Sequence, residues 1–299
     1  MGRDMQLTRR AAVFLFAVVI LVWGINWTVV KLIVLDIPPI WSAALRSLIA
    51  CLTVFLVQCA TNQFVLPRKE DVSIILVIGF LNMTLCPAFM AAGVQLIPVG
   101  RSVVLGYTTP LWVTPGAWLF LREPLPRRRL LGICIGLCGV FILCNPLALD
   151  WNKAAALLGH GYLLLHALSW AVAILRIRAH VWMSTPFQLL FWQALLASLL
   201  LSLLALAVEG IPSFTPTPSL LLLLAYCGIP ATALAFWAMT VINASLPATT
   251  TSLSLLATPV VGILGSVVFL GESVDLPLAA ATCLVLGGIA LGLFSPKPR

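Results

Sequence analysis

Long apolar runs separated by short polar segments make up almost the whole chain. The runs are continuous and lack the two-residue alternation of half-buried or barrel strands. A helix needs about 20 apolar residues to cross the hydrocarbon core of a bilayer. Breaks at prolines, glycines and clustered charges therefore predict ten membrane-spanning helices, at about 11–34, 40–60, 72–95, 98–121, 128–145, 157–177, 186–208, 219–242, 247–270 and 277–294.

Composition strengthens this pattern. Apolar residues make up 62% of the chain and charged residues only 9%, whereas a soluble domain carries roughly 25% charged residues. Most of the surface must therefore face lipid, where a spanning backbone has to be a helix or a closed barrel. The predicted fold class is an all-α integral membrane protein with the lipid bilayer as its partner, and the short connections leave no room for a soluble domain.

An internal repeat divides the chain into two parts. A shift of 149 residues places the segment TPLWVTPGAWLFLRE, which ends at Glu123, on TPVVGILGSVVFLGE, which ends at Glu272. A shift of 147 residues places Trp23 on Trp170. The predicted domains are residues 1–147, with the first five spans, and residues 148–299, with the last five. An odd number of spans per repeat makes the two repeats inverted, a common construction of secondary transporters.

The distribution of positive charge predicts the orientation. With the N-terminus in the cytoplasm, the larger share of the 17 lysines and arginines falls on the cytoplasmic side, most clearly at Arg127–Arg129. Cytoplasmic loops are rich in these residues. We therefore expect a multi-pass protein of the plasma or inner membrane with both termini cytoplasmic. Because the basic residues are scattered among short loops, the net charge of +8 does not predict nucleic-acid binding.

Several motifs resemble those of a known family. They are the sequence WGINW at 23–27 with Lys31, the sequence AALR at 43–46, and a proline followed by Leu-x-Glu in the fourth and ninth spans. With ten helices in two inverted repeats, the chain resembles the EamA-type exporters of the drug/metabolite transporter superfamily over nearly its whole length. The resemblance implies a plasma-membrane carrier, often an exporter of amino acids or other small metabolites, and leaves the substrate open.

The sequence thus predicts a secondary transporter of a small-molecule substrate, such as an amino acid or a related zwitterionic or aromatic compound. It would work by alternating access through a central cavity. A channel-like pore or an uptake permease for another small organic solute is the alternative. An enzyme is disfavoured because the chain has no GxSxG or HExxH motif and no paired membrane aspartates.

Polar and aromatic side chains within the spans predict where the cavity lies. Near the bilayer midplane, such side chains gather around the substrate of a transporter. Any one of them could equally serve helix packing, so the prediction rests on the set. The predicted cavity residues are Trp23, Asn26, Trp27, Asn82, Tyr107, Thr108, His166, Trp170, Trp237, Thr250 and Ser254.

Two repeated pairs predict gating elements. Pro110 and Pro259 occupy equivalent positions in the fourth and ninth spans, where a proline bends a helix. Glu123 and Glu272 follow the same two spans. A glutamate at a helix C-terminus opposes the helix dipole, so each needs another partner, such as the N-terminus of a neighbouring helix.

Charges within the spans are few. Arg46 and Arg101 are possible anion-attracting residues, although both are predicted near the outer face, where snorkelling explains them equally well. No aspartate or glutamate lies in the middle of a span. His166 is therefore the only central group that could couple transport to protons, and facilitated diffusion or exchange is as well supported as proton antiport.

The remaining features predict no cofactor and no metal site. The eight cysteines lie in apolar segments, without the spacing of a metal site. Small-residue stripes on the fifth and tenth spans, including Gly132 and Gly288, are of the kind that brings membrane helices close together. They could pack within one chain or form the seam of a homodimer.

Overall fold

The computed structural model describes residues 9–123, 125–144, 154–212, 214–245 and 255–293, and this part of the chain is helical without a strand. All packing in this part of the chain is therefore between the faces of helices. The elements are α1 (Arg9–Asp36), α2 (Pro39–Ala60), α3 (Lys69–Val77), η2 (Ile78–Leu85), α4 (Cys86–Leu96), α5 (Val99–Gly106), α6 (Thr109–Leu121), α7 (Arg127–Cys144), α8 (Ala154–Ala179), α9 (Pro186–Val208), α10 (Pro218–Gly228), η3 (Ile229–Leu234), α11 (Ala235–Ser245), α13 (Ala257–Leu270) and α14 (Leu276–Leu293).

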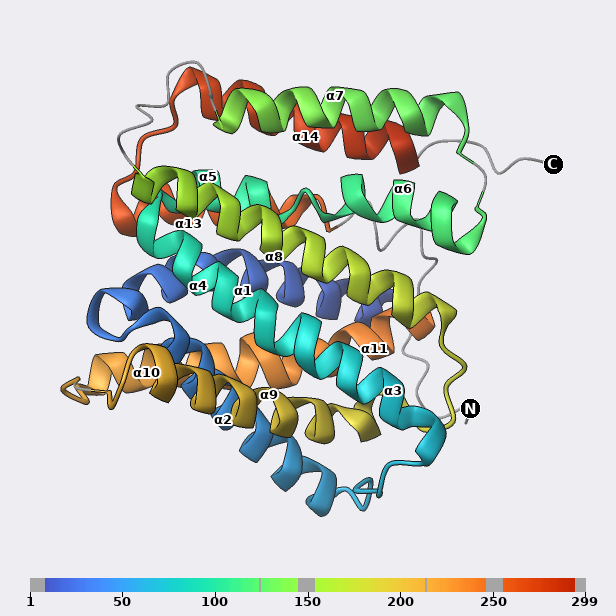
Figure 1. The fold of residues 1–299 in the computed structure, drawn as a ribbon, viewed down its shortest axis with the longest axis vertical. Helices are drawn as coiled ribbons and strands as arrows, with labels where there is room; N and C mark the ends of the chain where they lie inside the picture. Colours follow the sequence, from blue (N-terminus) through green and yellow to red (C-terminus); the bar gives the residue numbers. More distant parts are fainter. Residues whose placement is uncertain (1–8, 124, 145–153, 213, 246–254, 294–299) are drawn as a thin grey trace.

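The helices lie side by side and run between two ends of the molecule (Figure 1). We call the end where α1 begins and α14 finishes the terminal end, and the other the distal end; they lie to the right and left in Figure 1. Helices α7 and α14 pack against each other along one edge and run in opposite directions. Helix α8 likewise runs opposite to α1.

By length and composition, six helices in the described residues could cross a membrane, and two shorter apolar helices, α13 and α14, accompany them. The fourth predicted span, 98–121, is not one helix, because the chain turns at Tyr107 and Thr108 between α5 and α6. Helix α7 begins with three arginines. The count of ten spans stays a prediction, and the predicted boundary between residues 147 and 148 lies outside the described residues.

Elements recur along the chain at a constant spacing. The continuous helix α3–η2–α4 covers residues 69–96, and α10–η3–α11 covers 218–245, so both ends lie 149 residues apart. The ends of α7 and α14 show the same spacing. Packing pairs recur too: α1 packs on α13 as α8 packs on α6, and α8 packs on α4 as α1 packs on α11. The repeat seen in the sequence is therefore also a repeat of helix boundaries and contacts.

Glycines allow α7 and α14 to touch backbone to backbone. A Cβ atom added at Gly132 would lie 2.4 Å from the carbonyl oxygen of Gly288, and one added at Gly288 would lie 2.4 Å from that of Gly132. A carbon atom cannot approach an oxygen so closely, so only glycine fits at both positions. The small-residue stripes thus pack against each other within a single chain.

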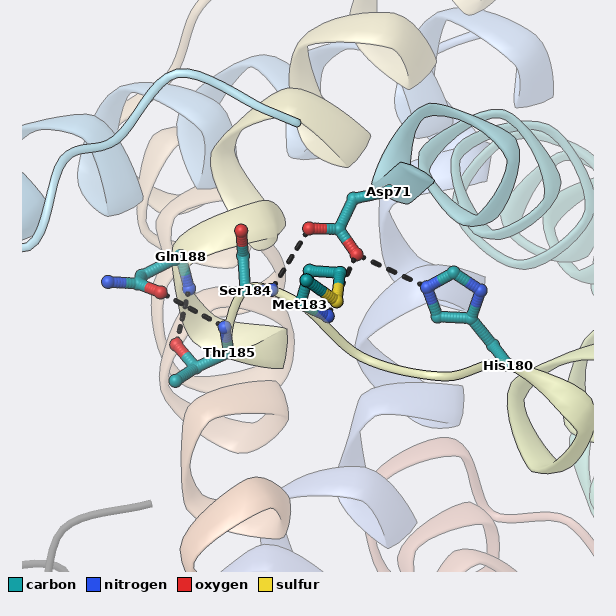
Figure 2. A network of polar contacts seen from close by, with 6 residues as sticks. All are labelled: Asp71, His180, Met183, Ser184, Thr185 and Gln188. Carbon is teal, nitrogen blue, oxygen red and sulfur yellow. Dashed lines mark hydrogen bonds and ion pairs between the residues drawn. The ribbon is translucent and has the colours of Figure 1, made fainter. Parts of the chain in front are cut away.

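Carboxylates from one half of the chain hold the starts of helices in the other half. Figure 2 shows Asp71, at the start of α3, accepting hydrogen bonds from the backbone N–H groups of 183–184 and contacting His180 at 3.2 Å. Beside it, Thr185 and Gln188 exchange hydrogen bonds in a capping box at the start of α9. Met183 and Ser184 lie just before Thr185, the N-cap of α9, so this network fixes α3 to the segment that leads into α9.

Glu209 does the same for α2. Its two carboxylate oxygens accept hydrogen bonds from the backbone N–H groups of Ile40 and Trp41, each at 2.9 Å. Neither Asp71 nor Glu209 was singled out in the sequence analysis, because nothing in a lone acidic residue between two apolar runs indicates which distant helix it caps.

Candidate functional site

A cavity lies in the middle of the helix bundle, between the two halves of the chain. Both halves contribute to its wall, through α1, α2, η2, α4, the residue after α5, α8, η3 and α11. The residues that line it are Trp23, Asn26, Trp27, Arg46, Ser47, Asn82, Met83, Cys86, Pro87, Met90, Tyr107, His166, Trp170, Ala231, Thr232 and Phe236.

The structure brings most of the predicted cavity residues to this wall. Trp23, Asn26, Trp27, Asn82, Tyr107, His166 and Trp170 line it together. Thr108 is buried beside the wall, with its hydroxyl donating to the carbonyl oxygen of Leu105 at 2.6 Å. Trp237 packs between apolar clusters of α1 and α9 instead. Thr250 and Ser254 lie outside the described residues.

Aromatic rings form one side of the cavity. Trp23 meets Trp170 and Phe236 edge to face, with ring centroids 6.1 Å apart in both pairs. The imidazole of His166 lies between Trp27 and Trp170, at 5.6 and 5.8 Å. Such edge-to-face contacts are the preferred arrangement of aromatic pairs, so the rings support one another and present a stiff, apolar surface to the cavity.

Two π-helical segments form another part of the wall. In η2 the hydroxyl of Thr84 donates to the carbonyl oxygen of Gly79, and in η3 that of Thr232 donates to Cys227, both at 2.7 Å. Single π-helical turns inside α-helices occur often at functional sites. The apolar pattern does not reveal them. The signals in the sequence are Pro230, inside η3, and Pro87, just after η2, because a proline cannot donate the usual backbone hydrogen bond.

Several polar atoms at the wall have protein partners. The indole N–H of Trp23 donates to the carbonyl oxygen of Ala231 at 3.0 Å, and the amide oxygen of Asn26 accepts from the thiol of Cys227 at 3.3 Å. Because a carbonyl oxygen only accepts, Nδ1 of His166 donates to Cys86, at 2.8 Å. The other ring nitrogen, Nε2, is buried without a partner among the described residues.

Arg46 is the one charged residue of the wall. One Nη atom donates to the hydroxyl of Thr232 at 2.9 Å, which links α2 to η3. The sequence analysis placed Arg46 near the outer face of the membrane, where snorkelling would explain it. In the structure the guanidinium instead turns inward to the cavity, because the π-helical turn of η3 brings Thr232 within its reach.

On the distal side of the cavity, one continuous apolar cluster fills the bundle. On α1 it extends from Trp27 to Ile37, on α4 from Met90 to Ile97, and on α5 from Val99 to Leu105. Leu220 and Leu224 of α10 join it. On each of these helices the cluster residues lie between the cavity and the distal end, so buried side chains close the cavity in that direction.

Apolar packing on the terminal side is divided. Among the described residues, three separate clusters occur there: one joins α2, α3 and α9, one joins α1 to α11, and one joins α6 to α8. On the distal side, by comparison, one large cluster is joined by a single small one that links α2, α4 and α9. Apolar packing is therefore more continuous at the distal end than at the terminal end.

Polar contacts reinforce the closed distal end. Both carboxylate oxygens of Glu272 accept hydrogen bonds at the start of α5, from the backbone N–H groups of Val99 and Gly100 at 2.7 and 2.9 Å. Glu272 therefore has the helix N-terminus that the sequence analysis expected as its partner. Nearby, the ammonium group of Lys31 donates to carbonyl oxygens at the end of α4, including that of Val94.

Arg101 lies at the distal surface, away from the cavity. Its guanidinium pairs with the carboxylate of Asp275 at 2.7 Å, and Asp275 also accepts a hydrogen bond from the backbone N–H of Leu278. The hydrogen bond from Leu278 and the contact with Arg101 hold the pKa of Asp275 below its usual value. Unlike Arg46, then, Arg101 already has an anionic partner.

At the terminal end, Glu123 has weaker partners. It lies 3.3 Å from the guanidinium of Arg178 and 3.8 Å from that of Arg129, and all three side chains are at least one-third exposed. Pairs of this kind contribute about 0–1 kcal/mol. Glu123 therefore holds the terminal end less firmly than Glu272 holds the distal end.

The paired prolines occupy the first turns of α6 and α13. Pro110 follows the break between α5 and α6, and Pro259 lies two residues after the start of α13. A proline is tolerated in the first turn because its missing N–H would have no partner there. Pro110 thus accompanies a break in the chain rather than a bend in a continuous helix.

No group of three metal-binding side chains occurs among the described residues. What the cavity offers is an aromatic surface, one guanidinium, amide groups and hydroxyls. Such a set binds and orients a small organic solute by noncovalent contacts.

Known proteins resemble this chain over its whole length. The EamA-like transporter family model matches it twice, at residues 10–145 and 157–294. The uncharacterized transporter YoaV of Bacillus subtilis is 24% identical over 94% of this chain and 96% of its own length. A probable amino-acid metabolite efflux pump of Salmonella typhimurium is 27% identical over 96% of both chains.

One solved crystal structure has the same fold, with a TM-score of 0.67 and 21% identity over 96% of this chain and 99% of the other. The long apolar helices and the transporter relatives agree in making this chain a membrane protein. Because the family model matches both halves, the chain belongs to the EamA-like transporter family.

Proposed function

We propose that this protein is a secondary transporter that exports a small metabolite, such as an amino acid or a related zwitterionic or aromatic compound, by alternating access. The observation that carries the proposal is the central cavity. Both family-matched halves line it, and packed side chains close it toward the distal end. The relatives named as amino-acid metabolite efflux pumps support export as its direction.

In this proposal the chain crosses the membrane ten times, as two inverted repeats of five helices. The 149-residue spacing of helix boundaries and the opposite directions of α1 and α8 support the inversion. Inverted repeats give a transporter two conformations of similar energy, because each half can adopt the shape of the other.

The terminal end lies in the cytoplasm in this proposal. Arg127–Arg129 at the start of α7 lies at this end, as do Arg176 and Arg178 in the last turn of α8. Cytoplasmic loops are rich in arginine and lysine. The conformation described here then has its distal, outer side closed, and a solute would enter the cavity from the cytoplasm.

Movement between the two conformations would use the breaks in the bundle. The turn at Tyr107 and Thr108, before Pro110, lets α5 change its angle to α6. Opening the distal end would require α5 to leave the carboxylate of Glu272. On this basis we keep the proposed hinge and gating roles of the two repeated pairs, Pro110 with Pro259 and Glu123 with Glu272.

Counterflow in proteoliposomes tests the proposal. Vesicles with the purified protein are loaded with amino acids, amines, nucleobases and organic acids, and mass spectrometry follows their loss, with and without an imposed proton gradient. We expect saturable release of one chemical class and exchange against the same solute outside. Release that does not saturate and shows no exchange would indicate a channel-like pore. In cells that express the protein, net accumulation of a solute inside the cell would indicate an uptake permease.

Variants of the wall locate the transport path. Replacing Asn26 or Trp170 by alanine should reduce transport while the protein stays folded, because both side chains line the cavity. Trp237→Phe is the matched control, since Trp237 is an equally large aromatic residue that lies away from the wall. Unchanged transport in both cavity variants would remove this cavity from the proposed path.

A further inference from the structure

The charges around the cavity are unbalanced. The wall contains the guanidinium of Arg46, and none of its sixteen residues is an aspartate or a glutamate. Among the described residues, no carboxylate oxygen lies within 4.0 Å of Arg46, and Thr232 is its one hydrogen-bond partner. The other arginine named as a possible anion-binding residue, Arg101, is already paired with Asp275.

An unpaired guanidinium inside a membrane protein is unfavourable, and charged side chains at this depth usually mark a functional site. Arg46 has five N–H donors in a planar fork, and the fork matches the two oxygens of a carboxylate. One donor is used by Thr232. The remaining donors suit a bidentate anion, because charge-assisted hydrogen bonds of this kind are short and strong.

The rest of the wall suits the body of such a solute. Trp23, Trp170 and Phe236 form an apolar aromatic surface on the other helices of the cavity. The wall also contains Asn82, whose side-chain amide can bind a polar group.

We propose that Arg46 binds the carboxylate of the transported solute, and that the substrates are small organic carboxylates with an apolar or aromatic body. This inference rests on the proposed function and narrows its substrate class. The wall has no acidic residue to accept a cation, so a solute whose carboxylate is converted to an amide loses its principal contact and keeps only the aromatic ones.

A series of four matched compounds tests the inference: L-phenylalanine, N-acetyl-L-phenylalanine, L-phenylalaninamide and N-acetyl-L-phenylalaninamide. They share one aromatic body and differ in whether a carboxylate is present. Binding to the purified full-length protein is measured by calorimetry, and their competition with the substrate found by counterflow is measured in proteoliposomes. We expect both carboxylates to bind about tenfold or more tightly than their amides, since a charged hydrogen-bonded pair is lost.

Four variants test whether the preference depends on Arg46. Arg46→Gln should abolish the difference between acid and amide, and Arg46→Lys should keep part of it, because lysine retains the charge without the fork. Arg101→Gln is the matched control and should leave the preference unchanged. Thr232→Val removes the protein partner of Arg46 but keeps its charge, and so should retain the preference even if it lowers thermal stability.

The outcomes separate the inference from the proposed function. Equal binding of acids and amides, or a preference that persists in a folded Arg46→Gln variant, overturns the inference and leaves a transporter of another solute class. Saturable counterflow of solutes without a carboxylate, and of no others, also overturns the inference and leaves the transporter. If Arg46→Gln does not fold, the inference is tested by the acid-to-amide difference in the wild type and by its reduction in Arg46→Lys. Absence of any carrier activity in the full metabolite pool, with and without a proton gradient, overturns both.

Discussion

The two halves of this protein share their backbone devices and differ in the chemistry attached to them. Each half has a π-helical turn at the cavity, stabilised by a threonine hydroxyl that donates to the carbonyl five residues earlier. Each also ends its fourth predicted span with a residue in the left-handed conformation, Arg122 or Gly271. The charges, however, are not repeated: α2 carries Arg46 in the cavity, whereas its counterpart α9 has the uncharged Gln193.

This difference shows how symmetry and specificity coexist in one chain. In the proposed mechanism, the repeated backbone features let the two halves exchange shapes, which alternating access requires. Side chains that are not repeated give the cavity one charged side. They also hold the distal end by stronger hydrogen bonds than the ion pairs at the terminal end. Paired variants, one in each half, make the comparison measurable.

The largest effect is expected where the halves meet, between α7 and α14. Gly288→Ala would place a Cβ 2.4 Å from a backbone oxygen of α7, which neither helix can avoid without moving apart. Overpacking of this kind destabilises by about 1–3 kcal/mol or more, so we expect a clear fall in the unfolding temperature in detergent. Gly287→Ala, where a Cβ meets no atom within 4 Å, should change it little. Equal effects of the two variants would contradict the close contact.

The second comparison concerns the paired glutamates. Glu272→Gln weakens two charged hydrogen bonds at the start of α5, each worth about 1.5–3 kcal/mol when lost entirely. Glu123→Gln affects only exposed ion pairs, worth about 0–1 kcal/mol. Thermal unfolding should therefore fall more for Glu272→Gln. Cysteine-accessibility labelling from each side should also detect opening of the distal end in that variant alone.

The third comparison concerns the two π-helical turns. Thr84→Val removes one buried hydrogen bond and should lower stability by about 1 kcal/mol, whereas Thr232→Val also removes the bond from Arg46 and should lower it further. Thr232 also accepts from Arg46 and lines the cavity, whereas Thr84 does not. Counterflow at matched protein amounts should therefore change in Thr232→Val and remain close to wild type in Thr84→Val. A transport defect of the same size in both would show that the turns matter for their shape alone.

The smallest effect is expected at the left-handed residues. Gly271 has a φ of 67° and Arg122 a φ of 55°, a conformation that glycine adopts freely and other residues adopt at a cost. Gly271→Ala should lower the free energy of unfolding by about 1 kcal/mol, and Arg122→Gly should raise it by up to about 1 kcal/mol. Opposite shifts in the unfolding temperature are the expected result, and shifts of one sign would contradict it.

Local sequence patterns predicted much of this fold. Helices α1, α2, α8 and α9 lie where the apolar runs place them, because length and hydropathy alone determine such segments. The grouping of Trp23, Asn26 and Trp27 on one face of α1 was also predictable, since they are three and four residues apart.

Features that depend on distant partners were not predictable in the same way. The inward position of Arg46 depends on η3, almost 190 residues further along the chain, and the apolar pattern is the same for a π-helical and an α-helical turn. Nor does the sequence show that Asp71 holds the segment before α9 or that Glu209 caps α2. Such contacts arise from the packing of whole helices.

The continuous apolar cluster at the distal end has a consequence for the energy supply of a cell. A membrane that holds an ion gradient tolerates no water-filled path across it, since even a brief leak would dissipate the voltage. From Trp27 to Ile37, and over the facing stretches of α4 and α5, most of the packed side chains are apolar, and polar ones such as Thr28 and Ser102 are buried with them. In the proposed transport cycle, this barrier separates the cavity from the outer compartment, so that a cavity filled from the cytoplasm does not become a leak for ions.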